Sequence, residues 1–482
     1  MATPFSSDLG SAPVPLRHPW QHCVGSCHAI TALRADWQSQ LARAHRELGV
    51  RHVRFHGMLD DAMGTVICQD ERYLYSFLNL DRIHDFLLGI GMRPIVELSF
   101  MPWSMASGGE TVFRYRGNIT PPRHLDDWTA LCTRLATHWC ERYGVDEVSQ
   151  WPIEVWNEPN LTAFWSGGQA GYFELYRRTW EAIKAVSPRL QVGGPVTAQN
   201  AWLPEFDAFA REHGCEPDFI STHYYPTDAF GQIGADTETQ LAHAPPGVMR
   251  DHAESARAIA GRRPLYYTEW NITSNPRDPL HDGAFCAALA IRLAMTVDDV
   301  VDAMAWWTFS DIFEENYLPS VPFHGGFGLL SLHDVAKPVY RGFELLRRLG
   351  PQAWAVEGRH DTLSAWVGAA DDRGADAVIV NVALPQHAIA SEDVELRLRL
   401  PPGRRAAAAF VSRIDESHAN PRAAWQAMGE PEYPSATQVA ALQVASVVVP
   451  EPWPLAEEDG LVKIALALPP NAVAGVRVEW RS

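Results

Sequence analysis

The chain has 482 residues, of which 46% are hydrophobic and 20% are charged, and its formal net charge is −18. This length suits one large domain with a smaller one, and the composition is that of an ordinary globular protein. The negative charge argues against nucleic acid or an anionic membrane surface as partner, because both attract basic proteins. It also disfavours acidic sugars unless a local basic pocket overrides it, and it leaves the oligomeric state open.

Two features bear on the cellular compartment. The first residues, 1–8, lack the basic segment and the apolar run of a secretion signal, and no later apolar run could span a bilayer. The seven cysteines show no CxxC pair and no zinc-ligand spacing. We therefore expect a reduced, cytoplasmic protein without a metal site.

Residues from about 20 to 345 alternate short apolar runs with longer amphipathic ones, the pattern of alternating strands and helices. An example of the helical pattern is 36–49, which ends in a glycine suited to a helix C-terminus. Eight apolar runs are predicted as strands: 22–26, 52–56, 94–100, 153–157, 190–194, 218–223, 265–269 and 303–308.

Eight such units predict a (β/α)₈ TIM barrel over residues 16–345. A doubly wound open sheet is the alternative, but no GxGxxG or phosphate-binding loop opens any unit. After residue 350, runs such as 394–400 alternate apolar and polar residues, as half-exposed antiparallel strands do. We expect an antiparallel β-sandwich domain over 346–482, and consider residues 1–15 as an added edge strand.

Two glutamates stand at the ends of predicted barrel strands, Glu158 after the fourth and Glu269 at the end of the seventh. The C-terminal strand ends form the active face of such a barrel. An ionised carboxylate resists desolvation, so this position favours a chemical role over a structural one. Paired carboxylates are the leading arrangement for cleaving glycosidic bonds, and we interpret the chain as a glycoside hydrolase.

Other polar and aromatic residues occur at the same strand ends. A single histidine or glutamate at a strand end more often forms a salt bridge in a loop than takes part in catalysis. The occurrence of several candidates at successive strand ends favours an active site. Adjacent residues on a regular strand point to opposite faces, so Asn157 and Glu158 share a pocket only if the backbone departs from β geometry near Pro159. The further candidates are His56, His223, Tyr225, Trp306 and Trp307.

The segment Trp156–Asn160, WNEPN, resembles the acid/base motif of clan A glycoside hydrolases. The wider chain resembles glycoside hydrolase family 39, which contains β-xylosidases and α-L-iduronidases, and within it the bacterial β-xylosidase branch. WNEP alone identifies the clan, and the combined set is specific to the family. The other matching segments are Arg54–Gly57, Glu97–Pro102, Phe219–His223, Thr268–Asn271, Trp307–Glu315 and Phe323–Gly328.

The resemblance implies a retaining mechanism in which Glu158 is the general acid/base and Glu269 the nucleophile. Carboxyls of retaining enzymes stand roughly 5–5.5 Å apart. The charge of an ionised Glu269 would keep Glu158 protonated until the glycosyl ester forms. Asn157 would hydrogen-bond the sugar 2-hydroxyl, and Tyr225 or His223 would donate to the nucleophile.

By the same resemblance, His56, His223, Trp307 and Glu315 bind the non-reducing sugar. Trp307 would stack under the ring, and a cis peptide would join it to Thr308. Without the resemblance, Glu315 and its neighbour Glu314 are equally well two solvated acids of a long loop. A retaining glycosidase needs neither a metal nor an organic cofactor.

The loop after the nucleophile departs from the family branch, whose members often carry a tyrosine there. Residues 270–280 contain none, which leaves the recognition of the sugar open. We expect Arg277 in this loop to form a salt bridge with Asp278 or Asp282, and a contact with a uronic acid carboxylate is the alternative.

We conclude that the sequence predicts an exo-acting retaining β-D-xylosidase that removes terminal xylose from small xylo-oligosaccharides, as in xylan degradation. The same mechanism on α-L-arabinosides or α-L-iduronides remains open. Iduronides would need a cationic partner, and Arg277 is the one candidate near the strand ends. The alternative from another class is a carbohydrate-binding protein without activity, which the presence of both carboxylates disfavours.

Overall fold

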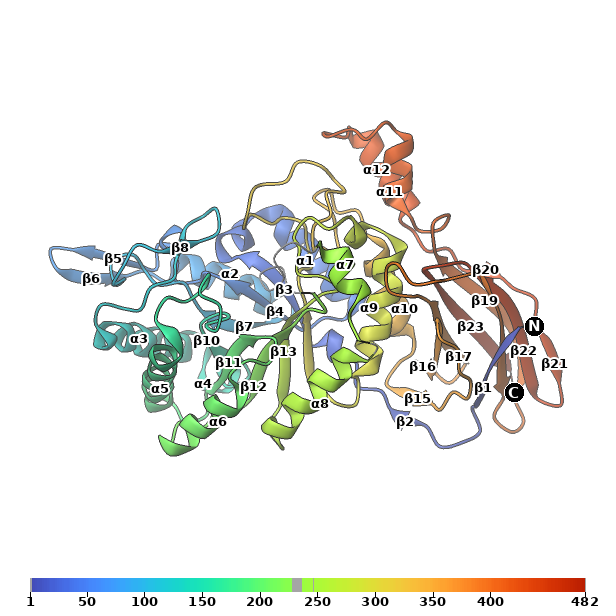
Figure 1. Cartoon of the computed structure of the whole chain (residues 1–482), viewed down its shortest axis with the longest axis horizontal. Coiled ribbons are helices and arrows are strands. Elements are labelled where there is room, and N and C mark those ends of the chain that lie inside the picture. Colours follow the sequence, from blue (N-terminus) through green and yellow to red (C-terminus); the bar gives the residue numbers. More distant parts are fainter. Residues whose placement is uncertain (1, 228–235, 246, 482) are drawn as a thin grey trace.

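The computed structural model describes residues 2–227, 236–245 and 247–481. A barrel and a β-sandwich lie next to each other, and both chain ends lie in the sandwich (Figure 1). Eight parallel strands close into the barrel, which confirms the predicted fold and excludes the open sheet. In chain order they are β3 (Cys23–His28), β4 (His52–His56), β7 (Arg93–Leu98), β10 (Pro152–Val155), β11 (Gln191–Ala198), β12 (Ile220–Tyr224), β13 (Leu265–Trp270) and β14 (Ala303–Trp306).

A helix follows each barrel strand and covers its outer side. Most of these helices have one apolar face, but α9 is buried on nearly all sides because it also packs against the sandwich strand β23 (Ala472–Arg481). The eight helices are α1 (Ala35–Leu48), α2 (Leu78–Gly89), α3 (Leu125–Tyr143), α5 (Gly168–Val186), α6 (Leu203–Glu212), α8 (Val248–Ala260), α9 (Ala284–Thr296) and α10 (Pro338–Arg348).

The last barrel strand is shorter than predicted. β14 ends at Trp306 because the chain then leaves the barrel, where Thr308 donates its N–H to the carbonyl of Phe327 in the following loop. This long loop, 307–337, returns to α10 and carries several of the predicted site residues.

The sandwich consists of two sheets with an apolar interior. Alternate residues of the neighbouring strands β18 and β22, such as Leu396 and Ile464, belong to one apolar cluster with residues of the other sheet, such as Val476. The four-stranded sheet has the order β1 (Thr3–Asp8), β18 (Glu392–Arg399), β22 (Leu461–Leu468) and β21 (Ala456–Glu458). The seven-stranded sheet has the order β2 (Val14–Pro15), β15 (Gln352–Trp354), β16 (Leu363–Ala369), β17 (Gly374–Asn381), β23 (Ala472–Arg481), β19 (Arg405–Ile414) and β20 (Glu451–Pro452).

The N-terminal segment joins both sheets, since β1 runs parallel to β18 and β2 pairs with β15. At the other end of the barrel chain, the boundary expected after residue 345 falls inside α10. We propose that the two domains divide between α10 and β15, where the chain turns from one to the other.

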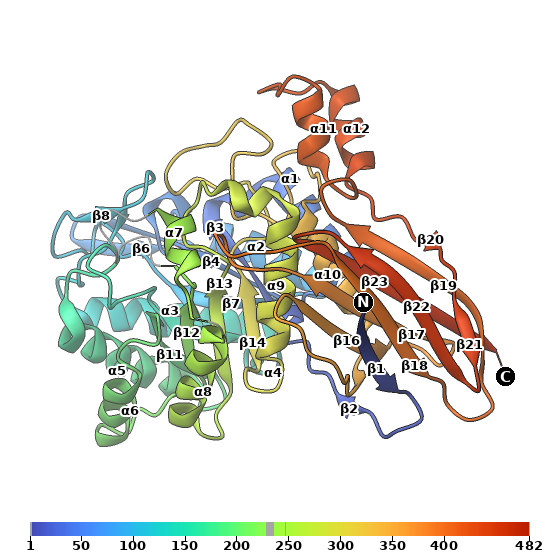
Figure 2. The same cartoon turned by 45° about the vertical axis from the view of Figure 1, so that its right-hand side comes forward.

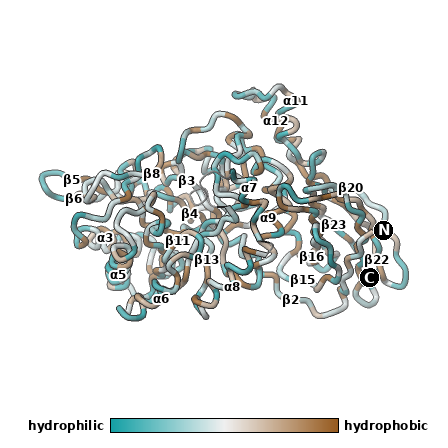
Figure 3. The backbone as a smooth tube through the Cα atoms, viewed as in Figure 1, coloured by the Kyte–Doolittle hydropathy of each residue, from teal (hydrophilic) through white to brown (hydrophobic). Residues whose placement is uncertain are grey.

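Short elements extend from these two frameworks. Figure 3 shows that the hairpin of β5 and β6 is hydrophilic at its tip. The pair α11 and α12 projects from the sandwich (Figure 2). Trp425 and Leu442 of this pair pack on Phe323 and Val335 of the loop after β14. Within the described parts of the chain, no helix is long and apolar enough to cross a membrane. The short elements are β5 (Val66–Gln69), β6 (Arg72–Tyr75), β8 (Thr111–Val112), β9 (Gly117–Asn118), α4 (Val145–Val148), α7 (Thr237–Ala242), α11 (Pro421–Ala427) and α12 (Ala436–Ala445).

Candidate active site

The floor of the candidate site is a buried arginine, Arg54 of β4. Its guanidinium contacts three carboxylates from three other strands: Nη2 lies 2.8 Å from Glu97, Nε 2.6 Å from Glu154 and Nη1 2.7 Å from Glu269. Burial alone would lower the pKa of Arg54, but the surrounding carboxylates outweigh it and raise the pKa. A permanent positive charge therefore lies under the strand ends.

Glu269, at the end of β13, is held from two sides. Its Oε1 pairs with Arg54, and its Oε2 accepts a hydrogen bond of 3.0 Å from the hydroxyl of Tyr225. Burial raises the pKa of Glu269 above its usual range, and the Arg54 charge limits that rise because it contacts the carboxylate directly. Both donors favour the ionised form and fix its orientation.

Asn157 and Glu158 follow β10 and line the same cavity. The strand ends at Val155, and the backbone φ is 75° at Trp156 and 42° at Glu158, which confirms the predicted departure from β geometry. The amide oxygen of Asn157 accepts from Arg54 at 2.9 Å, so its NH₂ group is the end available to a ligand.

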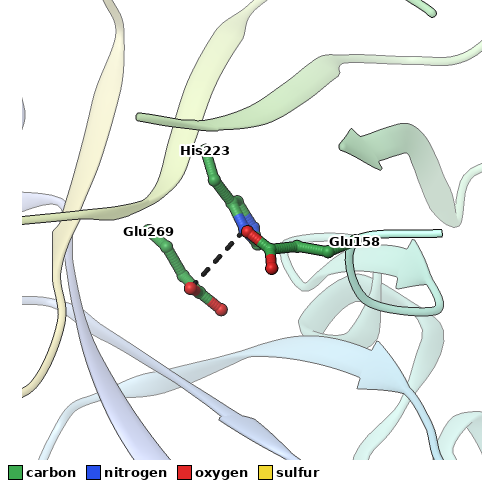
Figure 4. A group of neighbouring side chains, drawn as sticks. All are labelled: Glu158, His223 and Glu269. Atoms are coloured by element: carbon green, nitrogen blue, oxygen red, sulfur yellow. Dashed lines mark hydrogen bonds and ion pairs between the residues drawn. The ribbon is translucent and has the colours of Figure 1, made fainter. Parts of the chain in front are cut away.

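His223, near the end of β12, lies between the two glutamates (Figure 4). Its Nδ1 is 2.9 Å from Oε1 of Glu158 and 3.5 Å from Oε2 of Glu269. One carboxylate oxygen of Glu158 and one of Glu269 lie within 4.8 Å of each other. Burial, with the nearby charge of Arg54, holds the pKa of His223 well below its usual range, so its ring is neutral.

Three further predicted residues, His56, Trp307 and Glu315, line another part of the cavity wall. His56 donates toward Glu97 through Nδ1 at 2.8 Å, and its Nε2 lies 3.5 Å from Glu315. The ring centroids of His56 and Trp307 are 4.6 Å apart. The peptide between Trp307 and Thr308 is cis, as the resemblance implied.

Glu315 has an unusual environment for an acid. Burial raises the pKa of Glu315 well above its usual range, and the charge of Glu269 raises it further. Its Oε1 is buried and has no hydrogen-bond partner among the described residues. A protonated Glu315 at the cavity wall offers a hydrogen-bond donor to a ligand hydroxyl.

These side chains surround a cavity of about 380 Å³. Apolar and aromatic residues line much of it, and the described lining residues include no lysine or arginine. Eight of the nine predicted site residues are brought together here: Glu158, Glu269, His56, Asn157, His223, Tyr225, Trp307 and Glu315, with lining contributions from Phe113, Phe164, Ser274 and Phe327. Trp306 is the exception: it does not line the cavity, and it packs edge-on against Trp270 and donates through Nε1 to the carbonyl of Phe327.

A buried ion cluster connects the loops that form the rim. Nζ of Lys337 lies 2.7 Å from Asp282 and 2.7 Å from Asp311, and it donates to the carbonyl of Gly326 at 2.8 Å. Burial would lower the pKa of Lys337, but the two carboxylates outweigh it and raise the pKa. The cluster holds the loop after β13 against the loop after β14.

Arg277 differs from its expected role. Among the described residues it forms no salt bridge with Asp278 or Asp282; its guanidinium lies 4.4 Å from the ring centroid of Tyr317 instead. Asp282 pairs with Lys337, and Asp278 accepts a hydrogen bond from Thr237. Arg277 also does not line the cavity, which removes it as a direct partner of a uronic acid there.

The sequence analysis did not single out Arg54, Glu97 or Glu154 as site residues. Each is a charged residue inside a short, largely buried strand, and that position was the available signal. Glu158, His223 and Glu269 could in principle offer ligand atoms to a metal. The guanidinium of Arg54 already supplies the positive charge that Glu269 requires, so this donor set does not fit a resident metal ion.

Comparisons with known proteins show the family of the chain. The model of "Glycosyl hydrolases family 39" matches residues 8–458. A β-xylosidase of Caldicellulosiruptor saccharolyticus is 43% identical over 465 residues, which cover 94% of each chain, and one of Geobacillus stearothermophilus is 34% identical over 95% of this chain and 92% of its own. The structure of a family 39 β-xylosidase from Caulobacter crescentus superposes with a TM-score of 0.83 at 33% identity and covers 99% of this chain and 100% of the other. The chain belongs to glycosyl hydrolase family 39.

Proposed function

We propose that the protein is an exo-acting retaining β-D-xylosidase that releases terminal xylose from small xylo-oligosaccharides. The observation that carries the proposal is the nucleophile geometry. Glu269 is ion-paired to Arg54 and hydrogen-bonded to Tyr225, and it faces Glu158 across a gap that one sugar carbon and its leaving oxygen fit. The family resemblance and the β-xylosidase relatives support the choice of sugar.

In the first step, Oε2 or Oε1 of Glu269 attacks the anomeric carbon while Glu158 gives its proton to the leaving oxygen. The neutral ring of His223 donates through Nδ1 to Oε1 of Glu158, which leaves the other oxygen for proton transfer. Asn157 donates to the 2-hydroxyl, a contact that strengthens as the ring becomes oxocarbenium-like.

In the second step, Glu158 acts as the base for water, which displaces the sugar from Glu269. Formation of the ester has removed the negative charge of Glu269, which had kept Glu158 protonated. Glu158, having given its proton to the leaving oxygen, is then stable as a carboxylate and can accept a proton from the water. Two displacements at the same carbon return the original configuration, and the product is β-xylose.

The cavity wall favours a small neutral sugar. His56, Trp307 and a protonated Glu315 offer one flat face and polar groups for hydroxyls. The absence of lysine and arginine from the described lining disfavours an iduronide, whose carboxylate would remain unpaired beside two glutamates. An arabinopyranoside, which differs from xylose mainly at C4, is the second candidate.

A matched set of aryl glycosides tests the proposal: β-D-xylopyranoside, α-L-arabinopyranoside, α-L-arabinofuranoside, β-D-glucoside and α-L-iduronide. Initial rates are expected to be highest on the xyloside, with β-xylose appearing first in the ¹H NMR spectrum. A higher rate on another glycoside would show that xylose is not the preferred sugar, and it would leave the roles of Glu158 and Glu269 unchanged. No cleavage of any substrate would contradict the proposal and favour a binding protein.

We also propose a cytoplasmic location. All seven cysteines are unpaired, as is usual in a reducing compartment. Imported short oligosaccharides would then be the accessible substrates. Detection of the native protein in the periplasmic or secreted fraction of its host would contradict this proposal.

A further inference from the structure

A second cavity lies where the barrel meets the sandwich. Its volume is about 540 Å³, within the range of small-molecule sites. Among the described residues it shares no lining residue with the active-site cavity. Its apolar lining comes from α7, α8, α9 and the segment after β17, and includes Leu241, Val248, Leu289, Leu293, Val382 and Leu384.

One cation, Arg292 of α9, lies in the wall of this cavity. It donates to the backbone carbonyls of Val382, at 2.9 Å, and of Thr362, and so connects the barrel to the sandwich. Its Nε is buried and has no hydrogen-bond partner in the described part of the chain. Burial lowers the pKa of Arg292 to about 10, and no charge of the described residues offsets that effect.

Arg292 is partly buried, and its environment differs from that of three buried cations. Arg54 contacts three carboxylates, Lys337 two, and Arg341 pairs with Glu344 at 2.7 Å. Two carbonyls can dock a side chain between domains, but they do not neutralise its charge. Desolvation of a charge is costly, so a charge withdrawn from water is normally paired, and the partly buried Arg292 lacks such a partner within the described chain.

We propose that this cavity binds an organic acid with one carboxylate and an apolar body. The carboxylate would pair with the guanidinium of Arg292 and accept from the Nη hydrogens that the two backbone carbonyls leave free. The apolar body would pack against Leu289 and Leu293 of the same helix. The exposed Asp361 at the rim disfavours a second negative charge on the ligand.

Calorimetric titration with 3-phenylpropionate and with its uncharged analogue 3-phenylpropionamide tests the proposal. Saturating xylose is kept in the cell so that binding in the active site does not contribute. The acid is expected to bind at least ten-fold more tightly than the amide. Equal affinities, or no binding of the acid at millimolar concentration, would overturn the proposal.

The variant Arg292→Met is expected to reduce the affinity for the acid to that for the amide. Arg413→Met is the matched control, because Arg413 pairs with Glu451 on the sandwich surface, and its binding should be unchanged. Unaltered affinity of Arg292→Met for the acid would refute the assignment. A second variant, Ala388→Trp, fills part of the cavity at an exposed lining position and leaves Arg292 in place. It should reduce the affinity for both the acid and the amide, and it tests the site if Arg292→Met does not fold.

Discussion

Arg54 and Glu269 form a buried ion pair across the barrel, with 2.7 Å between Nη1 and Oε1. The same guanidinium also contacts Glu97 and Glu154, so one side chain aligns four barrel strands at the level of the site. Burying so many charges is tolerated only because they are mutually paired. The arrangement fixes the candidate nucleophile before any substrate arrives, which avoids reorganisation during the reaction.

The hydroxyl of Tyr225 is the second donor to Glu269, and Tyr225→Phe removes it. A hydrogen bond to a charged group is worth about 1.5–3 kcal/mol, so kcat/KM on an aryl xyloside should fall about 10- to 100-fold. Tyr224→Phe is the matched control. The Tyr224 hydroxyl is buried without a hydrogen-bond partner among the described residues, so its loss should leave kcat/KM unchanged. Similar losses in both variants would refute the role of Tyr225.

The role of Glu158 as proton donor predicts a dependence on the leaving group. Glu158→Ala should reduce kcat by about 10²–10⁴ for xylobiose, whose leaving sugar needs a proton, as general acid catalysis generally contributes. Hydrolysis of an activated dinitrophenyl xyloside should lose less in its first step, and added azide should restore turnover as β-xylosyl azide. Equal losses on both substrates would show that Glu158 does not donate the proton.

The raised pKa of Glu315 predicts a pH-dependent stability difference. A carboxyl whose pKa is higher in the folded than in the unfolded protein stabilises the fold below its unfolded pKa of about 4.3, and this contribution is lost as the pH rises toward the folded pKa. Glu315→Gln cannot ionise and keeps a donor. The free energy of unfolding of the variant minus that of the wild type, measured with urea, should therefore be larger at pH 7 than at pH 4.

Activity provides the companion test. Glu315→Gln imitates the protonated acid and should retain most of the wild-type kcat/KM at pH 7, whereas Glu315→Ala, which lacks the donor, should lose more. If the stability difference of the glutamine variant were the same at both pH values, Glu315 would be ionised in the folded protein.

The buried cluster at Lys337 predicts a large loss of stability. Lys337→Met leaves Asp282 and Asp311 without their cation, and breaking a buried ion pair costs about 3–5 kcal/mol. Arg177→Met, which breaks partly exposed pairs on α5, is the control and should cost about 1 kcal/mol or less. Chemical unfolding of both variants measures the difference, and equal losses would contradict the account.

The periodicity of the sequence predicted the barrel well because buried parallel strands are continuous apolar runs. The strand over 265–269 is observed as β13, and the helix over 36–49 as α1, within a residue or two at each end. The end of β14 was misplaced because the turn after Trp306 depends on pairing with Phe327, twenty-one residues later. The pair α11 and α12 was not predicted, since its apolar contacts lie on a distant barrel loop.

The site was predictable to the extent that its residues stand at strand ends. The sequence left open whether Tyr225 or His223 contacts Glu269, and the structure gives the hydrogen bond of 3.0 Å to Tyr225 and brings His223 closer to Glu158. Local patterns do not carry such information, because these distances depend on the closure of the barrel. The partners of Arg54 were inaccessible for the same reason.

The central claim, that Glu269 is the nucleophile, is tested most directly by trapping the glycosyl-enzyme. The protein is incubated with 2,4-dinitrophenyl 2-deoxy-2-fluoro-β-D-xyloside, digested with pepsin and mapped by mass spectrometry. We predict one fluoroxylosyl group per chain, attached at Glu269, and loss of labelling in Glu269→Gln. A label on another residue, or hydrolysis of the probe with inversion and no labelled peptide, would contradict the mechanism.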